Sequence, residues 1–589
     1  MAKPDCRTVW LVHPWPIRMT SKDRLSPKEH YQQMRVLSCE ELWNDEVPKF
    51  DQAGPRDRIS LVGIIRAVGV VFSESGTPAQ KDEARQWLQS LLQDPEEKVR
   101  RYAMVALPKI GAAEAEEGKL LSLLKKTSSD REKKFLAQTL EKIGGAATLE
   151  ATTSGDLARF DRTAQKVEAN LARQQNPTSI RFDATCPDIK DLLIHLRGRS
   201  GLETIIEQEV QSPAHRQKFR VTTCIRSIVA VQPLQPFSLA DIYDLRCFSE
   251  ASLVLGTVKQ RDNEVATIEA LAKVIASPAT HKLLAALTDG PIRYRLEFAS
   301  LGHQRSGVRQ LSNRVYALNP QLLNDSRNAP WEINIYHTPQ GLSVELTPKL
   351  RPDPRFAYRR RDIPAASHPP LAACIAHLAE PEKGDTVWDP FCGSGLELIE
   401  RAILGQVGHL FGTDRSDEAI AIAQQNLAAS PAAATPHTFT CCDFRDYAQV
   451  DGLRHLSLIV TNPPMGRRVP VANLKHLIED LFVAASETLQ VGGRLVFANP
   501  LPTRPRDHTL KLEFRQKVDL GGFHCHLEKY VKLDPRTPRP SGRPERRERP
   551  AHSSTGQKTS GPAKDFRPAS PLRKKHGWDN MKPQHRKGS

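Results

Sequence analysis

Four short polar motifs in the last third of the chain each follow an apolar run that predicts a β-strand. They are "WDPFCGSG" with Asp389, "GTDRS" with Asp414, "CCDFRD" with Asp443 and "VTNPPMGRR" with Asn462. Ligands of open α/β sheets bind outside the carboxyl ends of the strands, where such motifs would meet. The four motifs therefore predict one polar ligand site at a sheet edge.

The first motif predicts a glycine turn from a strand into a helix. Its turn is Gly393-Ser394-Gly395, and glycine lets a ligand approach the backbone closely. The dinucleotide pattern G-x-G-x-x-G is not met, because Leu398 takes its third glycine position, and the chain has no G-x-x-x-x-G-K-[ST] loop. These absences argue against nicotinamide or flavin enzymes and against P-loop nucleotidases.

The acids at the next two strand ends suggest what the ligand is. Asp414 is placed to accept hydrogen bonds from ribose hydroxyls, and Asp443 to accept one from an adenine amino group. One glycine turn and two such acids fit an adenosine-containing ligand without a pyrophosphate. S-adenosylmethionine (SAM) has that shape.

The fourth motif, Asn462-Pro463-Pro464, ends a buried strand with a rigid corner. Neither proline has an N–H, and each is fixed near φ −65°. An exocyclic base amine is a poor nucleophile because its lone pair is delocalised into the ring. The Asn462 side-chain oxygen and the Pro463 carbonyl can each accept one amine hydrogen, which orients the amine and helps restore the lone pair. This chemistry is positioning and electrostatic preorganisation, and it needs no metal or covalent intermediate.

The elements that position these motifs alternate between strand and helix from about residue 380. Apolar runs such as "DTVWDPF", "GHLFGTD" and "LSLIVTN" alternate with helical stretches such as "SDEAIAIAQQNLAA". Alternation of this kind predicts a parallel sheet with helices on both faces.

Residues 55–150 have apolar positions at helical spacing. The ending Lys-Ile-Gly occurs at 109–111 and again at 142–144, a period typical of stacked helical hairpins. The region resembles HEAT-type repeats, and a plain helical bundle is the alternative. The polar stretch 151–179 is interpreted as a linker or a bridging helix, and residues 1–54 as a separate N-terminal segment.

Residues 180–350 mix both kinds of pattern and predict an α+β region. "DIKDLLIHL" and "SGLETIIEQEV" predict helices, whereas "FRVTTCIRSIVAV", "IRYRLEFASL" and "WEINIYHTPQGLSVEL" predict strands. The chain becomes rich in Pro, Arg, Ser and Lys after Lys532. Residues 534–589 are therefore predicted to be a disordered basic tail.

Composition restricts the class of protein. The chain has 589 residues, 39% of them hydrophobic, and a formal net charge of +16 that favours polyanionic partners such as nucleic acid. An ordinary soluble protein with a basic tail is the alternative. No apolar run reaches the roughly 18 residues of a membrane span, and no signal peptide is evident, so we expect a cytoplasmic protein. The 10 cysteines form no C-x-x-C pair, which predicts free thiols and no metal site.

The four motifs together with "LIERA" resemble class I SAM-dependent methyltransferases, in particular the THUMP-domain RNA methyltransferases that act on N2 of guanosine. The resemblance covers residues 351–533 as the Rossmann-like catalytic domain and extends over 180–350 as a ferredoxin-like and THUMP-like RNA-binding region. It implies tRNA or rRNA as the substrate and SAM as the cofactor, with a protein partner for the helical repeats as a further expectation.

The resemblance also implies roles for individual residues. The expected catalytic residues are Asn462, Pro463, Pro464 and Met465. The expected cofactor-binding residues are Asp389, Phe391, Gly393, Ser394, Gly395, Asp414, Arg415, Asp443, Phe444 and Asn462.

The chain departs from the family at two positions. Met465 stands where relatives usually carry an aromatic residue that stacks on the flipped base, and Leu396 where they often carry threonine. Arg467 and Arg468 are expected either to hold substrate phosphates or to form a solvated loop. Three alternatives to the RNA enzyme stay open: a protein glutamine methyltransferase, a DNA adenine methyltransferase, and a non-catalytic RNA-binding scaffold.

Overall fold

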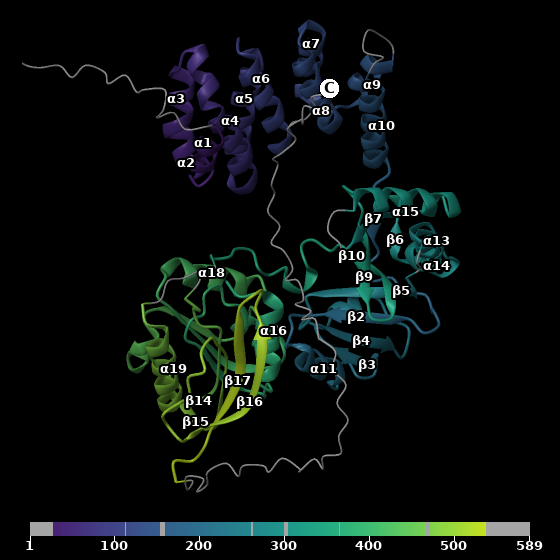
Figure 1. The fold of residues 1–589 in the computed structure, drawn as a ribbon. Coiled ribbons are helices and arrows are strands. Elements are labelled where there is room, and N and C mark those ends of the chain that lie inside the picture. The colour runs from purple at the N-terminus through teal and green to yellow at the C-terminus, as the bar shows by residue number, and fades with distance from the viewer. Residues whose placement is uncertain are drawn as a thin grey trace, which may run out of the picture. The chain divides into compact units, whose positions relative to one another are not determined.

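The computed structural model describes residues 27–111, 114–153, 160–260, 263–299, 304–364, 366–466 and 472–536. The chain divides into two compact units, residues 1–177 and 178–589, and each is considered by itself (Figure 1). Arg467, Arg468 and most of the predicted basic tail lie outside the described residues.

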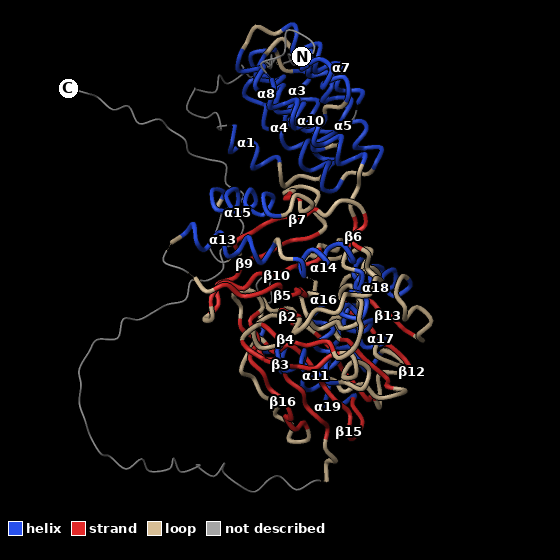
Figure 2. The backbone as a smooth tube through the Cα atoms, turned by 90° about the vertical axis from the view of Figure 1, so that its right-hand side faces the viewer, coloured by secondary structure: helices blue, strands red, loops and turns tan. Residues whose placement is uncertain are grey.

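The N-terminal unit contains only helices among its described residues, whereas strands begin in the second unit (Figure 2). Its α-helices are α1 (Pro27–Met34), α2 (Cys39–Glu41), α3 (Val47–Gln52), α4 (Pro55–Ser75), α5 (Pro78–Ser90), α6 (Glu97–Ala106), α7 (Glu114–Lys126), α8 (Asp130–Ile143), α9 (Ala146–Thr153) and α10 (Asp161–Gln175). Alternate helices pack together: α4 contacts α6, α6 contacts α8, and α8 contacts α10, while α7 contacts α9. The helices predicted between 55 and 150 are confirmed, and α10 lies in the stretch expected to be a linker or a helix.

Ion pairs of one kind join successive helical pairs of this unit. Arg58 Nη1 lies 2.7 Å from Asp94 Oδ2, and Arg100 Nε lies 2.5 Å from Glu132 Oε1. Both carboxylates are about 1% exposed, and the arginines supply their charge partners. The first pair joins α4 to the residue just before α6, and the second joins α6 to α8, so each arginine supplies the partner that a buried carboxylate needs.

The second unit begins with an α+β region. Its elements are β1 (Ser179–Ile180), β2 (Leu193–Arg197), α11 (Glu203–Gln211), β3 (Phe219–Ile225), β4 (Ile228–Pro233), α12 (Leu239–Tyr243), β5 (Glu250–Val258), α13 (Glu264–Ile275), α14 (Pro278–Leu287), β6 (Thr288–Asp289), β7 (Arg293–Phe298), α15 (Arg305–Leu318), β8 (Leu323–Asn324), β9 (Trp331–Thr338) and β10 (Gly341–Pro348). Eight strands form one sheet in the order β3-β4-β2-β5-β10-β9-β7-β8, and β1 pairs with β6.

The helix predicted for "DIKDLLIHL" is wrong, because its second half is strand β2. Asp191 has φ 58°, which interrupts a helix, and the next residues alternate in burial. Ile194 and Leu196 are fully buried, so this short run has the period of two that a strand requires. The predicted helix α11, the β3–β4 strands and the β9–β10 hairpin are confirmed.

The rest of the second unit is built on a seven-stranded sheet. Its elements are α16 (Pro369–Leu378), β11 (Asp385–Asp389), α17 (Leu396–Ile403), β12 (Val407–Asp414), α18 (Asp417–Ala428), β13 (His437–Cys441), the 3₁₀ segment η6 (Phe444–Gln449), β14 (Leu456–Thr461), α19 (Leu474–Thr488), β15 (Leu489–Asn499), β16 (Leu510–Asp519) and β17 (His524–Lys532). The strand order is β13-β12-β11-β14-β15-β17-β16.

Five neighbouring strands of this sheet, from β13 to β15, are parallel as predicted. The final pair differs, since β17 runs antiparallel to both β15 and β16. Alternate residues of the strands point to opposite faces of the sheet. Val387 and Leu458 pack in the core that includes α16 and α17, whereas Trp388 and Ile459 pack in a second core with α19. A doubly wound α/β domain results, with an antiparallel hairpin at one edge.

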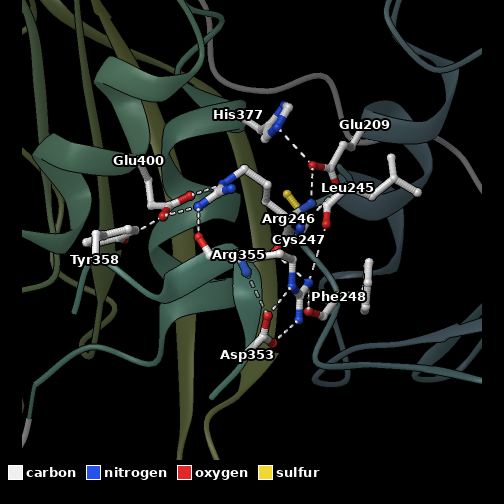
Figure 3. Close-up of polar contacts among 10 residues, drawn as sticks. All are labelled: Glu209, Leu245, Arg246, Cys247, Phe248, Asp353, Arg355, Tyr358, His377 and Glu400. Atoms are coloured by element: carbon white, nitrogen blue, oxygen red, sulfur yellow. Dashed lines mark hydrogen bonds and ion pairs between the residues drawn. The ribbon is translucent and has the colours of Figure 1, made fainter. Parts of the chain in front are cut away.

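The α+β region and the seven-stranded domain share one hydrophobic core. They also share a polar junction, which Figure 3 shows. Arg246 Nε and Nη2 lie 2.7 and 2.9 Å from the two carboxylate oxygens of Glu400 on α17. Tyr358 also donates to Glu400, at 2.5 Å, and Arg246 donates to the Arg355 carbonyl at 2.7 Å. The two parts therefore pack as one unit. No helix in the described part of the chain is long and apolar enough to cross a membrane.

Candidate active site

The seven-stranded sheet has its topological switch point between β11 and β14. From β11 the chain proceeds outward to β12 and β13 on one side, and β14 then pairs with β11 on the other. Ligands of doubly wound sheets bind in the crevice at this point. Asp389 ends β11 and Asn462 directly follows β14, so the fold brings the first and fourth predicted motifs together.

Asp389 is fully buried, and only one of its carboxylate oxygens is paired. Oδ1 accepts hydrogen bonds from Phe391 N at 3.0 Å and from Thr461 Oγ1 at 2.6 Å. Oδ2 is buried and has no partner among the described residues. Burial, and after it the nearby Glu397, raises the pKa of Asp389. An orphaned buried acceptor is expected where a ligand supplies the missing partner.

The two glycines of the turn lie against Ile363 and against helix α18, and neither has room for a side chain. Gly393 and Gly395 have φ of 51° and 83°, which favour glycine. A Cβ at position 395 would lie 3.2 Å from Ala423 Cβ. Asp414 Oδ2 accepts from Gly393 N at 3.0 Å, so the acid of the second motif also holds the turn of the first.

Asn426 on α18 supports the same turn and was not predicted. Its Nδ2 donates to Ser394 O at 3.0 Å and to Arg361 O at 3.0 Å, while its Oδ1 accepts from Arg360 N at 2.9 Å. The asparagine is fully buried. It fastens the turn to the segment before α16, which is 65 residues distant in sequence. The available signal was an asparagine at the helical spacing of the buried residues Ala419 and Ile422.

Asp443 follows β13 and is held by an arginine that sequence analysis did not single out. Arg445 Nη1 lies 3.2 and 3.1 Å from its two carboxylate oxygens, and Arg445 Nε lies 2.7 Å from Asp480. The predicted Arg415 is 3.9 Å from Asp443 and its side chain is 80% exposed. Beside this acid, the Phe391 and Phe444 rings pack with centroids 4.7 Å apart.

Asn462 is anchored through its amide nitrogen. Nδ2 donates to Ser367 Oγ at 2.7 Å, and Ser367 Oγ donates to Glu397 Oε1 at 2.5 Å. Asn462 Oδ1 is buried without a partner among the described residues. Pro463 is buried, and Met465 is partly buried against the shared core. Neither Ser367 nor Glu397 was predicted.

These features fit SAM, the cofactor predicted from the sequence. Two buried acceptors, Asp389 Oδ2 and Asn462 Oδ1, lie at these strand ends without partners among the described residues, and the glycine turn follows directly after Asp389. Unpaired carbonyl-type oxygens suit a ligand that carries ammonium, sulfonium and hydroxyl groups.

One group of metal-type side chains occurs in the described part of the chain, away from this crevice. It comprises Glu209, Cys247 and His377. The Glu209 carboxylate already accepts from Arg246 N at 2.6 Å and Cys247 N at 2.9 Å, and it lies 3.2 Å from His377 Nε2. We interpret the group as part of the polar junction in Figure 3.

Comparison with known proteins shows similarity in the same part of the chain. Residues 357–517 match the RMKL-like methyltransferase domain of the UPF0020 family. The chain is 30% identical over 172 residues to a probable tRNA (guanine(10)-N2)-dimethyltransferase of Methanothermococcus thermolithotrophicus, covering 28% of this chain and 98% of that protein. It is also 30% identical over 199 residues to a tRNA (guanine(6)-N2)-methyltransferase of Thermus thermophilus, covering 33% of this chain and 57% of that protein.

Two further relatives are tRNA (guanine(10)-N2)-dimethyltransferases, and the aligned part of the chain covers 45% and 47% of their lengths. The chain therefore spans about half the length of these two relatives and of the Thermus thermophilus methyltransferase. Among solved structures, TrmN from Thermus thermophilus aligns with a TM-score of 0.48 and 19% identity, covering 58% of this chain and all of that one.

Proposed function

We propose a function on the premise that the chain belongs to the UPF0020 family of RMKL-like methyltransferases and is a SAM-dependent methyltransferase. In this proposal it transfers a methyl group to an exocyclic base amine, N2 of guanosine in tRNA or rRNA. The relatives named above act on N2 of guanine in tRNA, which supports this choice of substrate. The compartment proposed is the cytoplasm, where both RNAs occur.

The observation that carries the proposal is the orientation of Asn462. Its Nδ2 is held by Ser367, so its buried and unpartnered Oδ1 is left to accept an amine hydrogen. The Pro463 carbonyl accepts the second hydrogen in our proposal, and the two prolines keep that carbonyl fixed. Two acceptors on one NH₂ group orient its lone pair, which catalyses by positioning and preorganised electrostatics.

The cofactor, when bound, supplies an electrophilic methyl group on a sulfonium. We assign its binding to Asp389, to the turn Gly393-Ser394-Gly395 and to Asp414. Asp389 Oδ2 is a buried acceptor, and Asp414 Oδ1 has Ser416 N as its one partner among the described residues, which leaves capacity for a ribose hydroxyl.

Further cofactor contacts in the proposal come from the ring pair and the third strand end. Phe391 and Phe444 form an apolar wall, and Asp443 accepts from the adenine amino group while Arg445 holds its carboxylate in place. Arg415, mostly exposed, lies at the edge of this site.

RNA selection is proposed for the regions before residue 351. We propose that residues 180–350 form a ferredoxin-like and THUMP-like region and that the catalytic domain spans residues 351–533. The basic segment 534–589 is proposed to contact RNA phosphates, together with Arg467 and Arg468. Met465 is proposed to contact the flipped base as a polarisable apolar side chain.

The N-terminal helices are proposed to be HEAT-like repeats over 55–150 that recruit a partner. Their neighbour-to-neighbour packing and repeated Arg–carboxylate pairs support this assignment. Lys109, in the first Lys-Ile-Gly motif, has a pKa lowered by burial and then by Arg66, Lys142 and Arg35. This gathering of cations across several helices favours an acidic partner surface.

Asn462→Ala tests the proposal. Purified protein with methyl-labelled SAM would be offered total tRNA, rRNA, duplex DNA and total protein, and RNA products would be digested to nucleosides for mass spectrometry. We expect label in N2-methylguanosine and a rate loss on the order of 10²–10³ in the variant, with an unchanged melting temperature. Glu418→Ala, an exposed change on α18, is the control.

The other outcomes separate the alternatives. Label in protein or DNA alone would refute the RNA substrate and favour a glutamine or adenine methyltransferase. An unlabelled reaction together with absent SAM binding would favour the scaffold.

A further inference from the structure

A chain of three hydrogen-bonding side chains runs from helix α17 to the amine site. Glu397 Oε1 accepts from Ser367 Oγ at 2.5 Å, and Ser367 Oγ accepts from Asn462 Nδ2 at 2.7 Å. The three residues come from α17, the segment before α16 and the end of β14, and Glu397 is 3% exposed. The fold alone brings them together, because they lie 30 and 95 residues apart in sequence.

The direction of this chain follows from the donors that each group has. An ionised Glu397 has no proton, so the single hydroxyl proton of Ser367 must point to it. Only lone pairs of Ser367 Oγ then face Asn462, and the asparagine must present its NH₂ group there. Asn462 Oδ1 is therefore left facing the crevice, buried and without a partner among the described residues.

We propose that Ser367 and Glu397 are positioning residues, which act through hydrogen bonds to fix the Asn462 amide with its oxygen toward the substrate amine. This inference rests on the proposed function, because it deepens the role given to Asn462. Without the hydrogen bonds from Glu397 through Ser367, the Asn462 amide can flip by 180° and present its NH₂ group to the substrate amine. Two NH₂ groups cannot hydrogen-bond each other productively through their donors, so that orientation does not bind the substrate amine correctly.

Protonation of Glu397 reverses the donor and acceptor roles along the three hydrogen-bonded side chains. A neutral carboxyl can donate to Ser367 Oγ, which frees the serine hydroxyl to donate to Asn462 Oδ1 and occupy the acceptor that the amine needs. Burial raises the pKa of Glu397 to about 7, against the opposing hydrogen bond from Ser367. The active orientation therefore forms as pH rises through this region and is lost as pH falls.

The groups around Glu397 do not change this sign. Glu400 on the same helix is paired with Arg246 and still raises the pKa of Glu397. The charge of Glu397 in turn raises the pKa of Asp389, a second buried acid at the end of β11. Burial raises the pKa of the Cys392 thiol and of Tyr358, so both stay neutral near pH 7.

His368, next to Ser367, has a pKa lowered to about 4 by burial and then by nearby arginines. It is therefore neutral over the range in which Glu397 titrates. Asp389 remains as the one competing carboxyl in this set, and the variants below separate it from Glu397.

The test measures kcat, the RNA KM and the SAM Kd of the full chain between about pH 5.5 and 8.5. The substrate is total tRNA with methyl-labelled SAM. Wild type should show a kcat that falls on the acid side of about pH 7. Glu397→Gln and Ser367→Ala should each lower kcat about tenfold at pH 8 and remove this acid limb, consistent with loss of one hydrogen bond to a charged group.

Three controls keep the result specific. Ser367→Thr keeps the hydroxyl and should restore both kcat and the acid limb. Glu400→Gln removes a neighbouring charge that raises the pKa of Glu397, so the folded variant should keep the acid limb and shift it only towards lower pH. The SAM Kd of Ser367→Ala and of Ser367→Thr should equal that of the wild type, which gives a readout independent of turnover.

Coupling between sites completes the test. On an Asn462→Ala background, Ser367→Ala should have no further effect on kcat, because the residues act as a unit. An acid limb that persists in Glu397→Gln, or a wild-type kcat in Ser367→Ala, would overturn the inference and leave the proposed function standing. A wild-type chain that binds SAM but methylates no RNA would overturn the proposed function instead.

Discussion

Helix α17 carries two buried carboxylates three residues apart that serve different regions. Glu400 faces the polar junction, where Arg246 and Tyr358 donate to both of its oxygens (Figure 3). Glu397 faces the strand-end crevice, where Asp389 Oδ2 and Asn462 Oδ1 lack partners among the described residues. Buried polar groups are normally paired, so the paired junction stabilises the structure and the incomplete crevice is where a ligand belongs.

The largest expected effect is on the junction. Arg246→Ala leaves Glu400 buried with its arginine partner removed, which should lower the free energy of unfolding by about 3–5 kcal/mol. Urea denaturation measures this loss, and kcat of the folded protein should stay near wild type. Arg361→Ala is the matched control, because its pair with Glu418 is exposed and is worth about 0–1 kcal/mol. An equal loss of unfolding free energy in the two variants would contradict a special role of the junction in stability.

A smaller effect on binding is expected at the crevice. Asp414→Ala removes the acceptor for Gly393 N and for the proposed ribose contact, so the SAM Kd should rise about tenfold to a hundredfold, as expected for a charge-assisted hydrogen bond. Calorimetric titration with SAM measures it, and Glu418→Ala should bind normally. If the variant loses stability but keeps its SAM affinity, Asp414 stabilises the fold, as Glu400 does, and does not bind the cofactor.

The smallest effect is expected at Met465. Stacking of a base on an aromatic ring is worth roughly 1–3 kcal/mol, of which methionine keeps a part. Met465→Phe should therefore raise kcat/KM for RNA several-fold, with Met465→Leu near wild type. Steady-state kinetics on tRNA would check this. A loss of activity in the phenylalanine variant would indicate that the pocket is shaped for methionine.

Local sequence patterns were sufficient to predict the strand-end motifs and most of the elements that carry them. Asp389, Asp414 and Asn462 each follow an apolar run, and the glycine turn marks the start of α17. Ser367 and Glu397 could not be found in this way, since a hydrogen bond across 30 residues leaves no local period. Arg445 was missed because Asp443, two residues earlier, was assigned to the adenine amino group without needing an arginine partner.

The misassigned strand and the edge hairpin have physical reasons as well. Residues 188–196 have enough apolar positions for a helical face, and tertiary pairing of β2 with β4 and β5 decided otherwise. The β16–β17 hairpin reverses the parallel order because two antiparallel strands can be joined by a short turn, here through Gly521 and Gly522 with positive φ.

The junction also bears on how the second unit folds during synthesis. Arg246 pairs with a residue made 154 positions later, and Asp519 N donates to Ser200 O at 2.9 Å near the end of β16. A Cβ at Gly201 would clash with the Lys517 carbonyl, so backbone meets backbone there. The α+β region therefore leaves the ribosome with part of its core surface uncovered. We expect slow, high-contact-order folding that completes only after β16 has emerged.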